Sequence, residues 1–300
     1  MNRFSKEQFI SGKNRGVIEM MDSYRARLDK AKAALEEADT ILLGGGAGLS
    51  AAAGIAYSGK PFTDHFGPFI EKYGFTDLYT SSFYPFATEE EKWAYWAKHI
   101  SLSRYEAGAT KLYQDLFRLV QDKPYFVITT NVESQFEKGG FPPDRIFEIQ
   151  GNYSYLQCAK GCHNKLYYNE QIVKDMIQQT VNCQIPAELV PKCPVCGGKM
   201  DPNLRMNRYF VQDDKWHDRD TSYKNFLLNA EEKKIVFLEL GVGFNTPGII
   251  RYPFETMTYH NERAILIRLN KDHPEGMQEI NAKTITFTED MQEIVLAVMK

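Results

Sequence analysis

Apolar and polar residues follow two different periods along this chain, and the changes of period outline its helices and strands. Between Met21 and Ala38, apolar residues recur at intervals of three and four, which predicts an amphipathic helix. Six short apolar runs have no helical period and are typical of strands buried in a parallel sheet. These predicted strands cover residues 41–43, 125–130, 146–149, 235–240, 264–269 and 283–287.

Segments of helical period separate several of these runs. A helix is predicted over about 109–120, and a terminal helix begins near Glu289. Residues 62–105 are rich in aromatic side chains without a strand pattern, and we interpret them as a helical insertion whose rings mostly pack in a core. Strands that alternate with helices indicate an α/β fold with a doubly wound, Rossmann-like parallel sheet.

A glycine-rich loop joins the first predicted strand to a helix. Gly46, Gly48 and Ala51 have the spacing of the dinucleotide fingerprint, in which missing side chains let the backbone approach a pyrophosphate at a helix N-terminus. A dehydrogenase would also carry an acidic residue at the end of a second strand, about 20 residues on. Asp64 and Glu71 lie instead in an aromatic stretch, which disfavours that class. A tight turn without a ligand stays open as the alternative.

The cysteines suggest a metal site. Four of the five form two closely spaced pairs with 30 residues between them: Cys158 and Cys162, and Cys193 and Cys196. Two such pairs fit one tetrahedral Zn²⁺, and a shell of four thiolates leaves no position for water, so we expect a structural zinc. His163 is a further candidate ligand, although we interpret it as a surface imidazole. Cys183 is interpreted as a free thiol.

Composition narrows the function classes. The 300 residues are 43% apolar with a net charge of −3 and have no block of Lys or Arg, which argues against nucleic acid or an anionic membrane as the main partner. The uncharged run 40–59 holds six glycines and is a poor membrane span. The N-terminus of the chain has no apolar segment typical of a secretion signal, so we expect a cytoplasmic protein.

Several motifs, in register with the cysteine pairs, resemble those of the sirtuin family. Residues 46–55 resemble the signature GAGIS-x-x-SGI, and 129–140 align without a gap with the TQNID…ERAG stretch. Residues 146–151 align with the stretch that ends in His-Gly, and 241–243 resemble the GTS loop. Residues 267–270 resemble the strand end that meets the adenosine ribose. Together these cover about residues 20–295, nearly the whole chain.

The resemblance implies two domains with NAD, as co-substrate, in the cleft between them. The NAD-binding Rossmann-like domain would comprise residues 1–60, 106–151 and 205–300, and the helical insertion 61–105 would join the zinc-binding module 152–204 in a small domain. Tyr57 and Phe66 are our candidates for lining the nicotinamide pocket. The other residues assigned to NAD are Gly45, Gly46, Ala47, Gly48, Ser50, Ala51, Gly54, Ile55, Thr130, Asn131, Glu133, Gln150, Gly241, Val242, Gly243, Asn245, Leu269 and Asn270.

One departure from the family changes the expected chemistry. Deacylases of this family carry a histidine general base at the position of Gln150, and a carboxamide does not titrate near neutral pH. Its loss should slow the base-dependent step by about 10²–10⁴-fold. Residues 56–59 and 204–209 also lack the deacylase sequences expected there. Asn131, which in the family contacts the reacting ribose, is retained.

This combination is similar to the macrodomain-linked class M sirtuins. For that class, the resemblance implies a protein ADP-ribosyltransferase that cleaves nicotinamide from NAD, with Asn131 and Gln150 as the catalytic residues. It also implies a lipoylated glycine-cleavage-H-like carrier as target and a functional link to a macrodomain ADP-ribosyl hydrolase. Arg205 and Arg208 are typical of a solvated face, and their place near the expected cleft leaves contact with an acidic target open as the alternative.

Three alternatives stay open on the sequence alone. The first is a deacylase with a relocated base, for which His163 or Tyr153 is close enough in sequence. The second is an NAD-binding pseudoenzyme or sensor, and the third is an enzyme that hydrolyses NAD with water as the acceptor. Release of nicotinamide separates the enzymes from the binding protein.

Overall fold

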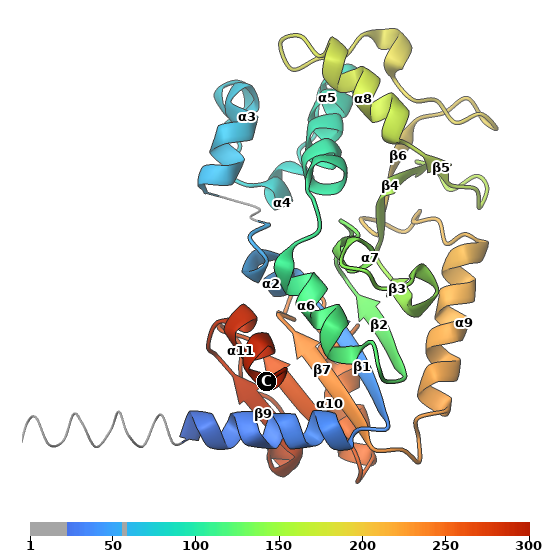
Figure 1. Cartoon of the computed structure of the whole chain (residues 1–300). Coiled ribbons are helices and arrows are strands. Elements are labelled where there is room, and N and C mark those ends of the chain that lie inside the picture. Colours follow the sequence, from blue (N-terminus) through green and yellow to red (C-terminus); the bar gives the residue numbers. More distant parts are fainter. Residues whose placement is uncertain (1–22, 56–58) are drawn as a thin grey trace, which may run out of the picture.

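The structure is a computed structural model that describes residues 23–55 and 59–300. Its larger lobe is built on a six-stranded sheet, in which every neighbouring pair is parallel and the order is β3-β2-β1-β7-β8-β9 (Figure 1). The strands are β1 (Thr40–Gly45), β2 (Tyr125–Thr129), β3 (Ile146–Glu148), β7 (Ile235–Leu240), β8 (Ile265–Leu269) and β9 (Thr284–Phe287). All six predicted strands are present, and the prediction of a doubly wound parallel sheet is confirmed.

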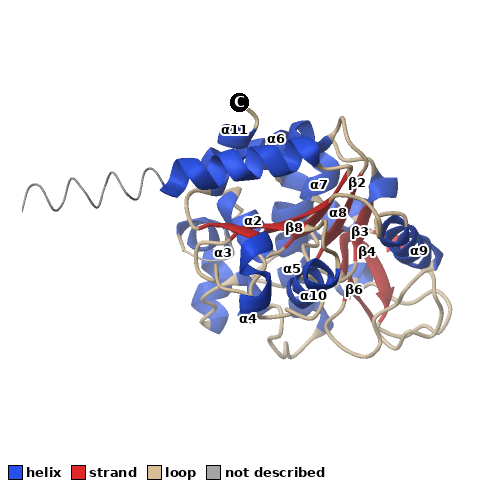
Figure 2. Ribbon diagram, turned by 90° about the horizontal axis from the view of Figure 1, so that it is seen from below, coloured by secondary structure: helices blue, strands red, loops and turns tan. Residues whose placement is uncertain are grey.

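Helices cover both faces of this sheet. Residues that alternate along each strand point to opposite faces, and because apolar side chains lie on both faces, both must be covered. The helix over residues 23–37, α6 (Lys111–Val120) and α11 (Met291–Val298) lie on the face to which Ile41 and Leu43 belong (Figure 2). Helices α9 (Asp214–Leu228) and α10 (Arg251–His260) cover the opposite face, where Leu42 is buried. The sheet is therefore the middle layer of three.

The smaller lobe combines helices with a three-stranded antiparallel sheet of order β5-β4-β6. Its elements are α3 (Lys60–Tyr73), α4 (Leu78–Ser81), α5 (Glu89–Ile100), a π-helical turn (Ser101–Glu106), β4 (Gly151–Cys158), β5 (Tyr167–Tyr168), α8 (Glu170–Gln179), the 3₁₀ turn Ala187–Leu189 and β6 (Met200–Leu204). One hydrophobic core contains Phe66 and Trp93 from the first segment together with Leu156 and Met176 from the second. Two segments far apart in sequence thus fold as one lobe.

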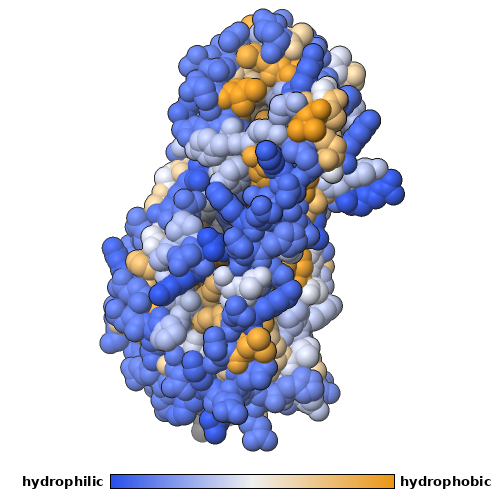
Figure 3. Space-filling view, turned by 90° about the vertical axis from the view of Figure 1, so that its right-hand side faces the viewer, coloured by the Kyte–Doolittle hydropathy of each residue, from blue (hydrophilic) through white to orange (hydrophobic). Residues whose placement is uncertain are grey.

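Four short elements complete the larger lobe: α2 (Ala47–Ala52), α7 (Gln135–Lys138), and the 3₁₀ turns Pro143–Arg145 and Gln278–Lys283. The face that lies to the right in Figure 1 is mostly hydrophilic, with small, separate hydrophobic patches (Figure 3). Within residues 23–55 and 59–300, no helix combines the length and the apolar content needed to cross a membrane.

Candidate active site

A cleft of about 690 Å³ lies between the lobes, at the carboxyl ends of β1, β2 and β7. In sheets of this kind the ligand site lies where the strand order reverses, and here β1 has β2 on one side and β7 on the other. From the larger lobe the cleft is lined by Gly46, Ala47, Gly48, Thr130, Asn131, Val132, Gln150, Arg205, Gly241, Val242, Gly243, Phe244, Asn245, Thr246, Asn270, Asp272 and His273. From the smaller lobe it is lined by Tyr79, Ser82, Phe83, Trp96, Tyr153 and Leu204, and Met206 follows Arg205 in the segment after β6.

Three glycines pack backbone against backbone at the floor of this cleft. The N–H of Gly48 donates to the carbonyl oxygen of Gly241 at 2.9 Å, and Gly241 has φ +60°. A Cβ on Gly46 or Gly48 would lie 2.7–2.8 Å from Gly241, and a Cβ on Gly241 would lie 2.2 Å from the nitrogen of Leu49. No larger residue fits any of the three positions, which explains the glycine spacing in the sequence.

The Asn131 side chain is fixed beneath the glycine loop. Its Nδ2 donates to the carbonyl oxygen of Gly46 at 3.0 Å and to Oη of Tyr113 at 3.2 Å. Both amide protons are therefore used within the protein, so Oδ1 is the atom that Asn131 can offer to a ligand.

A buried carboxylate supports this arrangement. Glu133 is 1% exposed and accepts hydrogen bonds from Ser50 Oγ at 2.5 Å and from the N–H of Val132 at 2.9 Å. Tyr113 Oη lies 3.5 Å from the same carboxylate, and burial raises the pKa of Tyr113 well above its usual value. Glu133 therefore braces the glycine loop and the segment after β2 from below and does not line the cleft.

Gln150 lies just beyond the end of β3, half-buried, and lines the cleft together with Asn131. Its carbonyl oxygen accepts a hydrogen bond from the N–H of Arg205 at 2.9 Å, which ties the end of β3 to the end of β6. Glu148, two residues earlier, is the titratable group nearest in sequence, and burial raises its pKa to about 7. Its carboxylate accepts a hydrogen bond from Asn152.

The loops after β7 and β8 form the opposite end of the cleft. Asn270 Nδ2 donates to the carbonyl oxygen of Val242 at 2.9 Å, and its Oδ1 accepts from the N–H of Asp272 at 3.2 Å and of His273 at 2.9 Å. Asn270 therefore uses its side chain to join the two loops. Asp272 and His273, which sequence reasoning missed, line the cleft because the hydrogen bonds of Asn270 turn the loop after β8 toward it.

The structure brings most of the predicted NAD residues together and places the others behind the cleft. Those that line it are Gly46, Ala47, Gly48, Thr130, Asn131, Gln150, Gly241, Val242, Gly243, Asn245 and Asn270. The remaining ones lie outside its lining: Gly45, Ser50, Ala51, Gly54, Ile55, Glu133 and Leu269. Tyr57 lies outside the described residues.

The expectation for Phe66 is wrong. Its side chain is 1% exposed and stacks on Phe62 with ring centroids 5.0 Å apart, so it belongs to the aromatic core of the smaller lobe. Other rings of the aromatic stretch, Tyr79, Phe83 and Trp96, reach the cleft instead. Composition cannot separate core rings from lining rings in a segment without a clear period.

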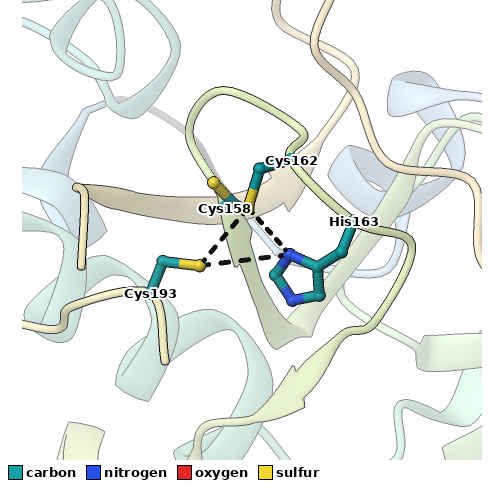
Figure 4. A group of neighbouring side chains, drawn as sticks. All are labelled: Cys158, Cys162, His163 and Cys193. Carbon is teal, nitrogen blue, oxygen red and sulfur yellow. Dashed lines mark hydrogen bonds between the residues drawn. The ribbon is translucent and has the colours of Figure 1, made fainter. Parts of the chain in front are cut away.

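Three of the four predicted zinc ligands, Cys158, Cys162 and Cys193, converge with His163 in the smaller lobe (Figure 4). The fourth, Cys196, lies beside Cys158. Sγ of Cys158 lies 3.7 Å from Sγ of Cys196, and Sγ of Cys162 lies 3.7 Å from Sγ of Cys193. These distances are far too long for disulfides, and Zn–S bonds of about 2.3 Å in a tetrahedron set sulfurs about 3.8 Å apart. The four thiols therefore fit Zn²⁺, which would hold the two knuckles together as a structural ion.

The interpretation of His163 as a surface imidazole is wrong. The half-buried His163 turns Nδ1 toward the sulfurs, 3.1 Å from Cys162 and 4.0 Å from Cys193 (Figure 4). Its Nε2 lies 2.7 Å from Oη of Tyr167. The ligand atoms of His163, Cys158, Cys162 and Cys193 lie within 4.8 Å of one another, so His163 competes with Cys196 for the fourth position of a four-coordinate ion. This placement also removes His163 as a relocated base, because it is absent from the lining of the cleft.

Comparisons with known proteins identify the family. No family model matches the chain. The chain is 34% identical over 282 residues to a protein ADP-ribosyltransferase of Staphylococcus aureus, with 94% of this chain and 90% of that protein aligned. It belongs to this family of protein ADP-ribosyltransferases. A probable bifunctional ADP-ribose hydrolase/ADP-ribosyltransferase of Fusarium oxysporum is 32% identical over 260 residues, which are 83% of this chain and 43% of that longer protein.

Solved structures place this ADP-ribosyltransferase within the sirtuin fold. A Sir2 structure bound to a propionylated peptide superposes with a TM-score of 0.56 at 17% identity, over 91% of this chain and 97% of that one. A Sir2 homologue in complex with ADP-ribose gives 0.53 at 16% identity, over 90% and 96%. The predicted sirtuin resemblance is thereby confirmed for the fold.

Proposed function

We propose that this protein cleaves nicotinamide from NAD and transfers ADP-ribose to a lipoylated glycine-cleavage-H-like carrier. Family membership supports the transferase class. The observation that carries the reaction type is the pairing of Asn131 with Gln150 in the cleft, where the deacylases have a titrating histidine beside the asparagine.

The reaction needs one bond broken and one formed at the anomeric carbon of the nicotinamide ribose. The C–N bond to nicotinamide breaks, nicotinamide leaves with the electron pair, and an oxygen of the target forms the new C–O bond. Asn131 would bind the ribose through Oδ1, and Gln150 would orient the ribose hydroxyls or the incoming nucleophile. An acidic side chain is the best acceptor, since its carboxylate has no proton to lose.

Two features of the cleft suit the proposed target. On the smaller lobe the mouth carries exposed aromatic rings, Tyr79 at 59% and Phe83 at 53% exposure, with their centroids 5.3 Å apart. An apolar arm such as a lipoyl group gains free energy by covering such rings. Arg205 and Arg208 are exposed nearby and favour an acidic carrier.

We further propose a functional link to an ADP-ribosyl hydrolase of the macrodomain type. The relative from Fusarium oxysporum supports it, because its name joins an ADP-ribose hydrolase and an ADP-ribosyltransferase in one protein and this chain covers 43% of its length. A partner that removes the modification would make it reversible.

Intact-mass spectrometry tests the proposal. Lipoylated and unlipoylated carrier are each incubated with the zinc-loaded protein and NAD, and nicotinamide is followed in parallel. We expect the carrier to gain the mass of one ADP-ribosyl group only when lipoylated. Nicotinamide without a modified carrier would point to hydrolysis or deacylation, and absence of both would leave an NAD-binding protein.

Variants assign the roles. Asn131→Ala and Gln150→Ala should each slow transfer by about 10–100-fold, the equivalent of about 1.4–2.8 kcal/mol. Gln171→Ala is the matched control, because Gln171 is an exposed glutamine of α8. Wild-type transfer rates in either site variant would contradict the assigned roles.

A further inference from the structure

A buried histidine that the reaction scheme above does not use touches two residues of the cleft wall. His99 is 1% exposed and lies on α5 behind the cleft. The Trp96 ring stacks on its imidazole, with centroids 5.2 Å apart and planes 9° from parallel, and Oη of Tyr153 lies 3.0 Å from its Nε2. Trp96 and Tyr153 both line the cleft, and His99 does not.

The hydrogen bonds around His99 point to one tautomer. Tyr95 Oη donates its one proton to the carbonyl oxygen of Leu78 at 3.0 Å, so it can only accept from Nδ1 of His99, 3.2 Å away. We therefore assign the proton to Nδ1. Burial lowers the pKa of His99 to about 3, which keeps the imidazole neutral and leaves Nε2 as an acceptor for the hydroxyl of Tyr153.

The series of hydrogen bonds from Tyr153 through His99 to Tyr95 ends on a backbone carbonyl group. The carbonyl oxygen of Leu78 accepts from Tyr95 and, at 2.7 Å, from the hydroxyl of Ser82. A carbonyl cannot pass a proton onward, so the array cannot carry protons from the cleft along this route. The array instead holds the rings of Tyr95, His99 and Tyr153 in place.

The side chains of Trp96 and Tyr153, which His99 contacts, line the cleft next to its Asn131 and Gln150 end. Tyr153 follows Gln150 by three residues, and its N–H donates to the carbonyl oxygen of Val132 at 3.0 Å, one residue after Asn131. We propose that His99 is a positioning residue: as the Nδ1-protonated neutral imidazole, it fixes the rings of Trp96 and Tyr153 as the wall against which the nicotinamide ribose reacts. This inference rests on the proposed function for the identity of the ligand.

The tautomer is measured first, on the full-length zinc-loaded protein with ¹⁵N-labelled histidine. We expect the signal of His99 to show a protonated Nδ1 and an unprotonated Nε2, and Tyr153→Phe to shift the Nε2 signal because it removes the donated hydroxyl. A proton on Nε2 in the wild type would overturn the inference.

Kinetics then separate positioning from folding. We expect Tyr153→Phe and His99→Gln to lower kcat for nicotinamide release by at least about tenfold, while KM for NAD changes less than about threefold because the loops after β7 and β8 are untouched. His99→Gln, whose amide oxygen can still accept from Tyr153, should retain more activity than His99→Leu. The control is Tyr168→Phe, which removes an exposed hydroxyl that donates to Glu170 at 2.6 Å, outside the lining of the cleft.

The outcomes distinguish this inference from the proposed function. Wild-type kcat in both Tyr153→Phe and His99→Gln, with only thermal stability reduced, would overturn the positioning role. If the wild type itself released no nicotinamide, the proposed function would fail, and an NAD titration would decide the inference. Ring signals of Trp96 and Tyr153 that shift on addition of NAD would support it, and unchanged signals at saturating NAD would overturn it.

Discussion

The loop that carries Asp272 and His273 into the cleft depends on a buried cluster of charges. Arg268 on β8 is fully buried and donates from Nε to Glu239 at 2.8 Å and from Nη2 to Glu239 at 2.9 Å and to Glu255 at 2.7 Å. Its Nη1 donates to the carbonyl oxygen of Glu275 at 2.5 Å, which anchors the loop.

Replacing Arg268 by Met removes a cation and leaves its acidic partners buried. Glu239 is 0% exposed, and Arg251, at 3.7 Å, would be its nearest remaining cation. Removal of one partner from such a pair costs about 3–5 kcal/mol, because the other charge stays buried without compensation. We therefore expect Arg268→Met to lower the free energy of unfolding by about that amount at pH 7.5, measured by urea denaturation.

The pH dependence follows from Glu239. Burial already raises the pKa of its carboxyl while Arg268 opposes the rise, so the variant should raise that pKa further above the unfolded value of about 4.3. A folded state with the higher pKa binds a proton more tightly than the unfolded chain. The loss of stability should therefore be largest above the folded pKa and shrink as the pH falls through it, so it is smaller at pH 5.5 than at pH 7.5.

Two further variants test this reasoning. Glu239→Gln combined with Arg268→Met should recover part of the lost stability, because the stranded charge is gone. Arg263→Met, which removes an exposed arginine bound to the carbonyl oxygen of Glu232, should change stability by less than about 0.5 kcal/mol. A loss below about 1 kcal/mol for Arg268→Met, or one that grows as the pH falls, would refute the argument.

Three other outcomes are expected. Gly241→Ala should lower the free energy of unfolding by about 2–5 kcal/mol in urea denaturation, because Gly241 has a positive φ and an added Cβ would force its backbone to shift. Gly248→Ala is the control and should not lower it, because a Cβ there meets no atom within 4 Å. Elemental analysis should find one zinc per chain, retained in His163→Ala and lost in Cys196→Ser; the reverse would make the histidine the fourth ligand. Tyr113→Phe removes a hydrogen-bond partner of Asn131 and should slow nicotinamide release by no more than about tenfold.

The sequence predicted the larger lobe well because its strands are continuous apolar runs. The run 235–240 coincides with β7, and the other predicted ends lie within two residues of the observed ones. The antiparallel sheet of the smaller lobe was not predicted strand by strand. Polar and apolar residues do not alternate regularly along β4, because parts of both its faces are buried.

The candidate site likewise has one part that the sequence predicted and one part that it did not. The glycine loop was predicted from its dinucleotide fingerprint, and the segments after β2 and β7 from their resemblance to sirtuin motifs. The fold brings them together because the carboxyl ends of parallel strands meet at one edge of the sheet. The contribution of the smaller lobe was not predicted, because which rings of the aromatic stretch face the cleft depends on how α4 and α5 pack. His99 gave no signal at all, since its role needs Tyr95 and Tyr153 beside it in space.

The two ends of the cleft differ in the chemistry they can support. At the β8 end lie Asp272 and His273. At the Gln150 end, the described lining consists of amides, hydroxyl groups, aromatic and aliphatic side chains and the guanidinium of Arg205, with no carboxylate or imidazole among them. Burial lowers the pKa of the nearby His99 and keeps its imidazole neutral. Departure of nicotinamide from NAD needs no proton to be removed, whereas attack by a hydroxyl or an ammonium group needs a base. A carboxylate acceptor, already ionised at neutral pH, needs none, so this end of the cleft suits the transfer of ADP-ribose to an acidic side chain that we propose.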